Sequence, residues 1–395
     1  MSLALPIAAT RRGACPTLDM PMQTGDGLLA RIRLAGGRID PVRLEQLATI
    51  CGTYGNGIIE ITARGNLQVR GLTAPAVPHF ARDVRQVIDI ETGLVVETPP
   101  LAGDDPLEFV DPRPLAAGIK AFSMPLTARL GPKVSVIVDG NGQIGLGALK
   151  ADLRLVAVGK DRWLLSIGAT LLGTTHHPLD CAELALTALA SLGPQARADD
   201  LDVAALMASL GSLVEHSAPV NQPSSSPIGD FILKDHTATG LGLPFGSIAW
   251  HAIGALADGA WRFGITEFRL APHHGLLAIH ADRSLLEEAL EVGFITRPND
   301  NRTRISACIG SDGCASGHIP ARAVASRLAA TVAPGMSLHV SGCTKGCAHP
   351  RRAALTLVGR PDGYGLVIDG KAGDTPVSVL RADQLESVTG TAAQG

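Results

Sequence analysis

The sequence predicts an α+β protein with a duplicated, pseudo-two-fold organisation and antiparallel or mixed sheets. Two internal repeats, separated by a Pro/Ser-rich stretch at 217–227, are the first observation. The second is that each repeat combines a helical hydrophobic period with the two-residue period of strands. With 395 residues, the chain is long enough for two or three units that each bury a core.

The first repeat relates two segments at a shift of 209 residues, without gaps. In the first copy, apolar residues at 42–51 follow helical spacing, and residues 58–69 alternate as two strands. Each copy therefore predicts a helix followed by strands. The matched pairs are Gly37 and Gly246, Ile39 and Ile248, Leu44 and Ile253, Leu47 and Leu256, Ala48 and Ala257, Tyr54 and Phe263, and Gly55 and Gly264.

The second repeat lies at a shift of 202 residues and matches 135–140 to 337–342. Each copy continues into a hairpin-like pair of segments, which ends at Gly168 or Gly370. The predicted order is therefore A, B, linker, A′ and B′. The expected boundaries are 1–95 for A, 96–215 for B, 216–230 for the linker, 231–300 for A′ and 301–395 for B′.

Four of the seven cysteines lie in one 40-residue stretch inside B′. Their spacing is C-x5-C and then, after 28 residues, C-x3-C. They are Cys308, Cys314, Cys343 and Cys347. All four stand in Gly/Ser-rich turns, where glycine lets the backbone bend around a bulky centre and brings amide donors near its sulfides. The pattern favours a [4Fe–4S] cluster bound by these four thiolates.

Three other interpretations of these cysteines compete with the cluster. Structural zinc prefers shorter knuckles than the x5 spacing. A disulfide framework needs an oxidising compartment, yet residues 1–15 show no secretory pattern, and the remaining cysteines are scattered. Chance proximity of buried cysteines is the third interpretation, and the presence of a glycine within two residues of each cysteine disfavours it. We expect a cytoplasmic protein.

Bulk composition excludes several classes of partner. The net charge of −3 is too small to argue attraction to nucleic acid or to a membrane surface. No apolar run approaches the length of a membrane span. We therefore expect neither nucleic acid nor membrane as a partner.

A G-x-G-x-x-G sequence at 140–145 is a weak signal for dinucleotide binding. Residues 146–152 are too few for a crossover helix before the next expected strand at 153–158. The repeat partner of this loop is the second cysteine turn. We therefore do not expect a flavin or nicotinamide site here. Electrons for the predicted iron–sulfur cluster must then come from a separate reductase that uses NADH or NADPH.

Polar residues occupy every second position between 62 and 70, which predicts one face of a strand. The alternative is an ordinary solvated face, but such faces mix acids with bases and this row contains no acid. Arginine pairs with carboxylates and other anions through a planar fork, so we predict an anion-binding floor. Its members are Thr62, Arg64, Asn66, Gln68 and Arg70, with Arg31 and Arg33 on a neighbouring strand.

The corresponding row in A′ has lost its charge and carries the adjacent pair His273 and His274 instead. Together with His349, these are candidate metal ligands; two histidines and a carboxylate are the usual ligands of a mononuclear non-haem iron. The alternative for each is a hydrogen-bonded or surface histidine. Neighbours on a strand point to opposite faces, so one of the pair at most could reach a shared metal.

Taken together, the repeat, the segments 31–37 and 62–70 and the cysteine set resemble the sulfite/nitrite reductase family over nearly the whole chain, from about Arg12 to Asp374. The resemblance implies ferredoxin-like half-domains in A and A′. It also implies a [4Fe–4S] cluster coupled to sirohaem through the thiolate at Cys347. Residues matching Arg31, Arg64 and Lys133 would grip the carboxylates of a tetrapyrrole or an anionic substrate.

Segments 11–16 and 22–29 are similar to the opening of the oxygen-dependent branch of this family, which acts in aerobic cobalamin biosynthesis. This implies a monooxygenase that converts precorrin-3A to precorrin-3B by C20 hydroxylation and γ-lactone formation, with a [4Fe–4S] cluster, a mononuclear non-haem iron and no sirohaem. Lys133 is followed by Val134 and Ser135, so the reductases' K-x-K pair is absent. The alternatives are a sirohaem-dependent sulfite or nitrite reductase and an electron carrier without turnover.

Overall fold

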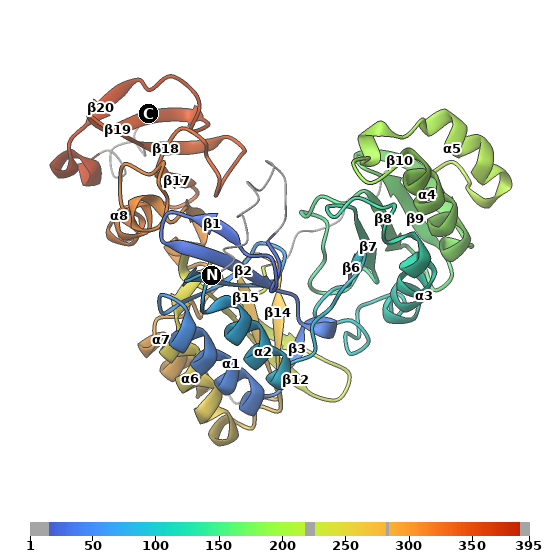
Figure 1. Ribbon diagram of the computed structural model, residues 1–395, viewed down its shortest axis with the longest axis horizontal. Helices are drawn as coiled ribbons and strands as arrows, with labels where there is room; N and C mark the ends of the chain where they lie inside the picture. The colour runs from blue at the N-terminus through green and yellow to red at the C-terminus, as the bar shows by residue number, and fades with distance from the viewer. Residues whose placement is uncertain (1–15, 218–225, 282–283, 388–395) are drawn as a thin grey trace, which may run out of the picture. The chain divides into compact units, whose positions relative to one another are not determined.

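The protein is described by a computed structural model covering residues 16–217, 226–281 and 284–387 (Figure 1). Part of the predicted linker and the motif at 11–15 lie outside the described residues. Two compact units divide the chain. Unit 1 comprises the described residues of 1–16, 33–37 and 89–238, and unit 2 those of 17–32, 38–88 and 239–395. Across the described segments, no helix combines the length and apolar character needed to cross a membrane.

Unit 2 contains the two half-domain sheets that the first repeat predicts. The first has the order β1-β2-β5-β4-β13, and its strand pairs are antiparallel. Its strands are β1 (Met22–Thr24), β2 (Gly27–Ile32), β5 (Leu67–Leu72), β4 (Ile58–Ile61) and β13 (Ser247–Ala249). The second contains, in order, β12 (Thr237–Gly242), β15 (Gly275–Ile279), β14 (Glu267–Ala271) and β3 (Arg38–Ile39), while β11 (Gly229–Ile232) belongs to unit 1.

The two copies exchange their shortest strands. β13, from the second copy, pairs with β4 of the first, with Ile248 opposite Ile59. Reciprocally, β3 pairs with β14, with Ile39 opposite Phe268. The half-domains are thus interlocked through main-chain hydrogen bonds. The sequence repeat did not predict this exchange, because strands of two or three residues carry no measurable period.

Helices α1 (Pro41–Tyr54) and α6 (Trp250–Asp258) confirm the helical period of the repeat. The Asp40 side chain caps α1 by accepting from the Arg43 amide at 3.0 Å, ahead of Pro41 at the first turn. α1 packs on α6 and on α2 (Val77–Val87), and these helices lie together in Figure 1, near α7 (Leu285–Glu291). A Cβ at Gly52 would lie 2.5 Å from the Trp250 ring, so only glycine permits this approach.

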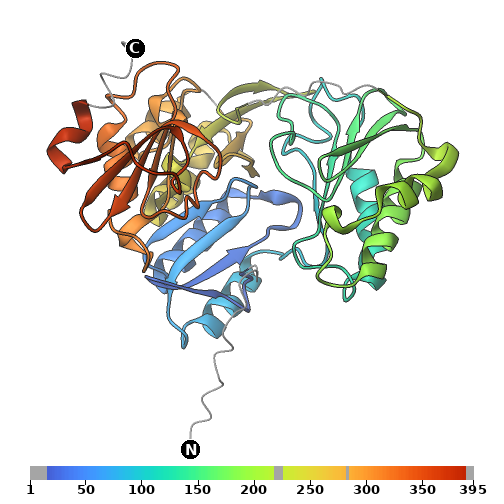
Figure 2. The same cartoon turned by 90° about the horizontal axis from the view of Figure 1, so that it is seen from above.

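Unit 1 holds a mixed sheet of order β10-β9-β8-β7-β6, and its helices lie along one side of it in Figure 2. Strands β6, β7 and β8 are parallel, and β9 and β10 continue antiparallel. The strands are β6 (Val95–Glu97), β7 (Ser135–Asp139), β8 (Leu153–Ala157), β9 (Trp163–Ile167) and β10 (Thr170–Thr175), and the helices are α3 (Arg113–Ser123), α4 (Pro178–Leu192) and α5 (Val203–Leu210).

The third sheet of unit 2 repeats this topology strand for strand, with the order β16-β17-β18-β19-β20 and the same change from parallel to antiparallel. This confirms the second repeat, although these sheets are mixed rather than mostly antiparallel. The elements are β16 (Ile305–Ala307), α8 (Ala321–Leu328), β17 (Leu338–Ser341), β18 (Ala353–Arg360), β19 (Gly363–Gly370) and β20 (Ser378–Leu380).

The G-x-G-x-x-G loop after β7 is packed against its own unit. The carboxylate of Asp139 accepts from the Asn141 amide at 2.8 Å, and that of Asp105 accepts from the Gln143 amide at 2.5 Å. A Cβ at Gly142 would lie 2.2 Å from Asp105. Residues 146–152 form turns, and the following element is a strand. The glycines therefore let two buried carboxylates close the loop.

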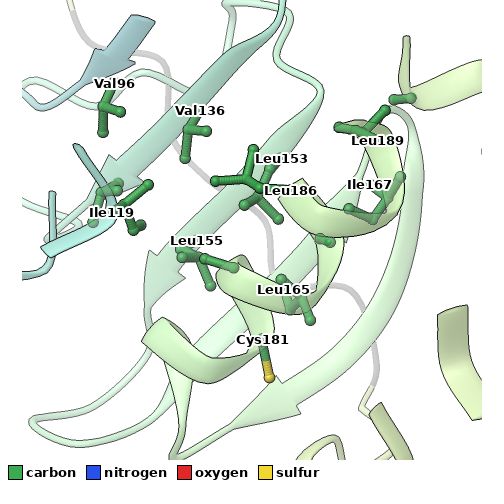
Figure 3. Packing of buried hydrophobic residues seen from close by; sticks show 14 of the residues in the cluster. Val96, Ile119, Val136, Leu153, Leu155, Leu165, Ile167, Cys181, Leu186 and Leu189 are labelled. Atoms are coloured by element: carbon green, nitrogen blue, oxygen red, sulfur yellow. The ribbon is translucent and has the colours of Figure 1, made fainter. Parts of the chain in front are cut away.

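The core of unit 1 supports a stability prediction. Leu155 is fully buried between the sheet and the helices, beside Leu153 and Leu186 in Figure 3. We expect Leu155→Ala to lower the free energy of unfolding of this unit by about 2–5 kcal/mol, through lost burial and a cavity. Leu192→Ala at the exposed end of α4, where the side chain is 52% exposed, is the matched control. Urea denaturation measures both, and equal losses would contradict the prediction.

Candidate functional site

The structure brings the four cysteines to one edge of the third sheet of unit 2. Cys308 directly follows β16, and Cys314 follows a short 3-10 turn at Gly310–Asp312. Cys343 and Cys347 lie in the turn after β17. Because β16 and β17 are adjacent and parallel, their carboxyl ends meet at the same edge. All four are free thiols; Cys347 is exposed and the others are half-buried.

Electrostatic coupling shows that the sulfurs are neighbours. Burial raises the pKa of Cys347, and Cys343, Cys308 and Cys314 each raise it further, while Lys345 opposes them. The Gly342 amide donates a hydrogen bond to the Cys308 sulfur at 3.1 Å. The Lys345 ammonium donates to the Ser316 hydroxyl at 2.9 Å and so joins the two cysteine turns.

The donor set fits a cluster better than a single ion. Within the described ranges, no three His, Cys, Asp or Glu residues converge closely enough to hold one metal ion. Structural zinc requires such convergence, whereas an iron–sulfur cluster spreads its four thiolates over several irons. Glycines bring the turns together: a Cβ at Gly342 would lie 2.7 Å from Gly310, and one at Gly317 would lie 2.5 Å from it. The two turns thus place the four cysteines at one edge of the sheet, with the Gly342 amide at the Cys308 sulfur.

A buried ion pair ties the first cysteine turn to the first half-domain. Arg70 on β5 donates to both carboxylate oxygens of Asp26, at 3.0 and 2.9 Å, and to the Gly313 carbonyl at 3.0 Å. The Gly25 amide also donates to this carbonyl, at 3.1 Å. Burial raises the pKa of Asp26, but hydrogen bonds from Arg70 and Thr24 outweigh it and hold the pKa below its usual value. Arg70 therefore supports the cysteine turn rather than an open anion-binding floor.

The predicted polar row is not one strand face. Residues 62–66 form a tight turn between β4 and β5, in which the Thr62 amide donates to the Asn66 carbonyl at 2.8 Å. Gly65 has a φ of 75°, a left-handed conformation that glycine adopts readily. Thr62, Arg64 and Asn66 therefore lie in a hairpin turn, and only Gln68 and Arg70 are on the strand. The Gly-Asn pair at 65–66 was the turn signal that the alternation argument passed over.

A different polar row crosses the same sheet. Arg31 on β2 donates to the Gln68 side chain at 3.1 and 2.8 Å, and Gln68 donates to Glu60 on β4 at 2.9 Å. Arg322 on α8 reaches the other oxygen of Glu60 at 2.5 Å. Cross-strand register places Arg31 opposite Gln68 and Gln68 opposite Glu60. We call this set, Arg31, Gln68, Glu60 and Arg322, the cross-sheet row.

The two hairpin turns related by the repeat pack on each other. The His273 amide donates to the Ala63 carbonyl at 3.0 Å, and His274 Nδ1 lies 2.6 Å from the Ile61 carbonyl. Burial, then His274 and Arg351, lower the pKa of His273. Burial also lowers the pKa of His274, and the hydrogen bond with the Ile61 carbonyl partly offsets this effect by raising it. Both imidazoles are therefore neutral near pH 7, with Arg64 half-buried in the facing turn.

The three histidines suggested as iron ligands are not assembled into a site. His349 Nε2 lies 3.2 Å from the Arg352 carbonyl. No three-residue ligand set that includes His273, His274 or His349 occurs in the part of the chain that the structure describes. Their role as iron ligands stays a hypothesis of the sequence.

Two other predicted substrate residues belong to unit 1. Arg33 pairs with Glu91 at 3.3 Å and donates to the Gly93 carbonyl at 3.2 Å. Lys133 is exposed in the turn before β7. The remaining members of the predicted floor all lie in unit 2, with the cysteines.

Sequence reasoning missed several residues of this region. Asp26, Glu60 and Arg322 carry its ion pairs but stand outside the alternating pattern. His339, on β17, is fully buried, and within the described segments neither ring nitrogen has a hydrogen-bond partner. Burial and the nearby His349 lower the pKa of His339 to about 4, so its imidazole is neutral. A histidine inside an apolar strand was the available signal.

Comparisons with known proteins agree with this architecture. Residues 20–87 match the nitrite/sulfite reductase ferredoxin-like half domain. A precorrin-3B synthase from Sinorhizobium sp is 40% identical to the chain, over 94% of this chain and 85% of the relative. The chloroplastic ferredoxin–nitrite reductase of Zea mays is 24% identical, over 84% of this chain and 69% of the relative.

Among solved structures, that of the Mycobacterium tuberculosis NirA protein aligns with a TM-score of 0.68 at 19% identity, covering 91% of this chain and 79% of that one. This likeness establishes the fold. The extent and level of the match to the Sinorhizobium relative establish membership of the precorrin-3B synthase family. The chain is therefore an enzyme of the precorrin-3B synthase family, within the nitrite and sulfite reductase group of oxidoreductases.

Proposed function

We propose that this enzyme of cobalamin biosynthesis is an O2-dependent monooxygenase that converts precorrin-3A to precorrin-3B. The reaction hydroxylates C20 and closes a γ-lactone from a ring acetate. One atom of O2 enters the product and the other leaves as water, so each turnover consumes two electrons and two protons. The electrons come from an external donor that oxidises NADH or NADPH. The 40% identity to a precorrin-3B synthase over nearly the whole chain is the observation that carries this proposal.

The substrate's carboxylates match the cations near the cysteine edge. Arg64 lies half-buried at the hairpin turn, and Arg31 and Arg322 end the cross-sheet row. Glu60 holds Arg322 in position, and Gln68 holds Arg31. An arginine fork placed in this way can grip a carboxylate bidentately. These residues would bind and orient the rim of the macrocycle, with Thr62 and Asn66 shaping the turn.

The cysteine edge would hold a [4Fe–4S] cluster, which supplies single-electron transfer when bound. The protein's contribution is to fix the two turns. Arg70 and Asp26 hold the first turn to β5, and Lys345 joins it to the second through Ser316. We assign no residue to a mononuclear iron, because the described histidines form no complete ligand set.

Anaerobic purification, followed by iron and sulfide determination and acid–acetone extraction of haem, tests the cofactor. Incubation with precorrin-3A, a reductant and O2 then tests the reaction. We expect a cluster, no extractable sirohaem, and a product heavier by one oxygen atom. Extractable sirohaem together with sulfite or nitrite reduction would favour the reductase alternative. A cluster without haem and an unchanged substrate mass would favour an electron carrier.

Arg64→Glu tests the carboxylate-binding role. Loss of a charge-assisted hydrogen bond of about 1.5–3 kcal/mol should raise KM for precorrin-3A by roughly 10-fold to 150-fold. The visible spectrum of the cluster should not change, because Arg64 lies in the turn between β4 and β5 and not in a cysteine turn. Arg43→Glu on α1, where the side chain is 56% exposed, is the control for charge reversal. An unchanged KM would remove Arg64 from the substrate site.

A further inference from the structure

His339 is a buried polar group whose hydrogen-bonding capacity is unused. Its side chain is 0% exposed, and neither Nδ1 nor Nε2 has a hydrogen-bond partner among the residues that the structure describes. A neutral imidazole offers one N–H donor and one lone pair, and each group left unsatisfied in the interior costs about 1–3 kcal/mol. Buried polar groups in folded proteins are rarely left in this state. The residue therefore indicates a partner that the described part of the polypeptide does not supply.

The surroundings of His339 place that partner at the second cysteine turn. A Cβ at Gly346, next to Cys347, would lie 3.7 Å from His339 Cε1, so the turn covers the ring. Two residues further along β17, Ser341 donates to the Cys343 carbonyl at 2.7 Å and ties the same turn to the strand. The ring thus lies beneath the loop that connects two of the four thiolates.

None of the other neighbours of the ring among the described residues makes a hydrogen bond with it. The hydroxyl of Thr356, opposite His339 in register, donates to the Gly370 carbonyl at 3.0 Å. The His349 ring lies 5.6 Å away, centroid to centroid, with its Nε2 at the Arg352 carbonyl. The Ala372 side chain, which also lies beneath Gly346, belongs to a small apolar cluster with Val358 and Val367.

We propose that His339 donates a hydrogen bond from its ring N–H to a sulfur of the cluster bound by the cysteine edge, and thereby raises the cluster's reduction potential. Hydrogen bonds to the sulfurs stabilise the additional negative charge of the reduced cluster. His339 is a positioning residue and not a catalytic one. The proposal rests on the presence of the [4Fe–4S] cluster proposed above.

The test compares His339→Leu, which removes the donor, with His339→Gln, which keeps an N–H donor. Each purified full-length protein is analysed for iron and sulfide, and its reduction potential is measured by EPR-monitored titration. We expect His339→Leu to retain the cluster and to be harder to reduce by about tenfold, a shift of about 59 mV to lower potential for one electron. His339→Gln should recover part of the shift. His79→Leu, at an exposed position of α2, is the control and should leave the potential unchanged.

Three outcomes overturn the inference. An unchanged potential in His339→Leu with a full cluster would make His339 a packing residue. Loss of one iron per chain with the cluster intact would make it a metal ligand. Wild-type protein without a cluster would refute the proposed cofactor itself, and the iron analysis identifies that case before any variant is studied.

If His339→Leu does not fold, proton ENDOR of the reduced wild-type cluster decides the question. We expect a strongly coupled proton that exchanges only slowly with D2O and that shows coupling to histidine nitrogen after ¹⁵N-histidine labelling. Absence of both couplings would overturn the inference.

Discussion

Replacing Arg70 by methionine is expected to lower the free energy of unfolding of unit 2 by about 3–5 kcal/mol and to reduce iron and sulfide content. The substitution leaves the Asp26 carboxylate, whose side chain is 9% exposed, as a buried charge without its partner. It also removes the donor that holds the Gly313 carbonyl beside Cys314. Chemical denaturation and iron analysis of the purified variant measure the two effects.

Arg43→Met is the matched control, because its pair with Asp40 is 56% and 46% exposed and is worth at most about 1 kcal/mol. If Arg70→Met kept full stability and full iron content, Arg70 would not support the cysteine turn, and its assignment to the substrate floor would have to be reconsidered.

The effect of Arg70→Met should depend on pH. The pKa of Asp26 is lowered in the folded protein, so the pair stabilises above the unfolded pKa of about 3.8, and this contribution is lost as pH falls through the folded value. In the variant, burial without Arg70 should raise the pKa of Asp26. The stability difference between wild type and variant should therefore narrow as pH falls from the raised pKa of Asp26 in the variant towards its lowered pKa in the wild type. A difference that stays constant down to pH 3 would show that the ion pair is not its source.

Replacing Cys343 by alanine is expected to abolish binding of the proposed [4Fe–4S] cluster. Four thiolates hold a [4Fe–4S] centre, and Cys343 and Cys347 share one turn, so the loss of one thiolate leaves an incomplete ligand set at a partly exposed edge. The broad visible absorption of the cluster and its EPR signal should disappear, and iron and sulfide should fall towards zero. Catalytic turnover should be lost with them.

Cys51→Ala is the control for this experiment. Cys51 lies buried in α1, and burial raises the pKa of its thiol to about 12, so it is an inert packing residue. This variant should keep its cluster. Full iron content in Cys343→Ala, or stoichiometric zinc in the wild-type protein, would refute the assignment of the four cysteines to an iron–sulfur cluster.

Much of the architecture could be predicted from local patterns. The helical period at 42–51, preceded by Asp40 and Pro41, located α1 because a cap and a period act on neighbouring residues. The repeat at a shift of 202 residues predicted two sheets of like topology. The exchange of β3 and β13 could not be predicted, since two or three residues carry no period and their partners come from the other copy.

The polar row shows where such reasoning stops. The alternation of polar residues between 62 and 70 predicted one strand where the structure has a hairpin turn followed by a strand. The prediction failed because polar and charged residues are common both in turns and on exposed strand faces. It also could not reveal that Arg70 is neutralised by Asp26, 44 positions away, and bound to Gly313, 243 positions away. The partner of Glu60 is Arg322, separated from it by 262 residues.

By itself, the sequence determined the α+β class, the duplication and the four cysteines that predict an iron–sulfur centre, since period, repetition and ligand spacing are local properties of the chain. Only the tertiary structure decided which charged residues support the fold, as Arg70 does, and which belong to the cross-sheet row, as Arg31 and Arg322 do. It also showed His339 buried beneath the second cysteine turn without a partner. The physical reason is that ion pairing and burial depend on groups brought together from distant segments, and no local pattern encodes those encounters.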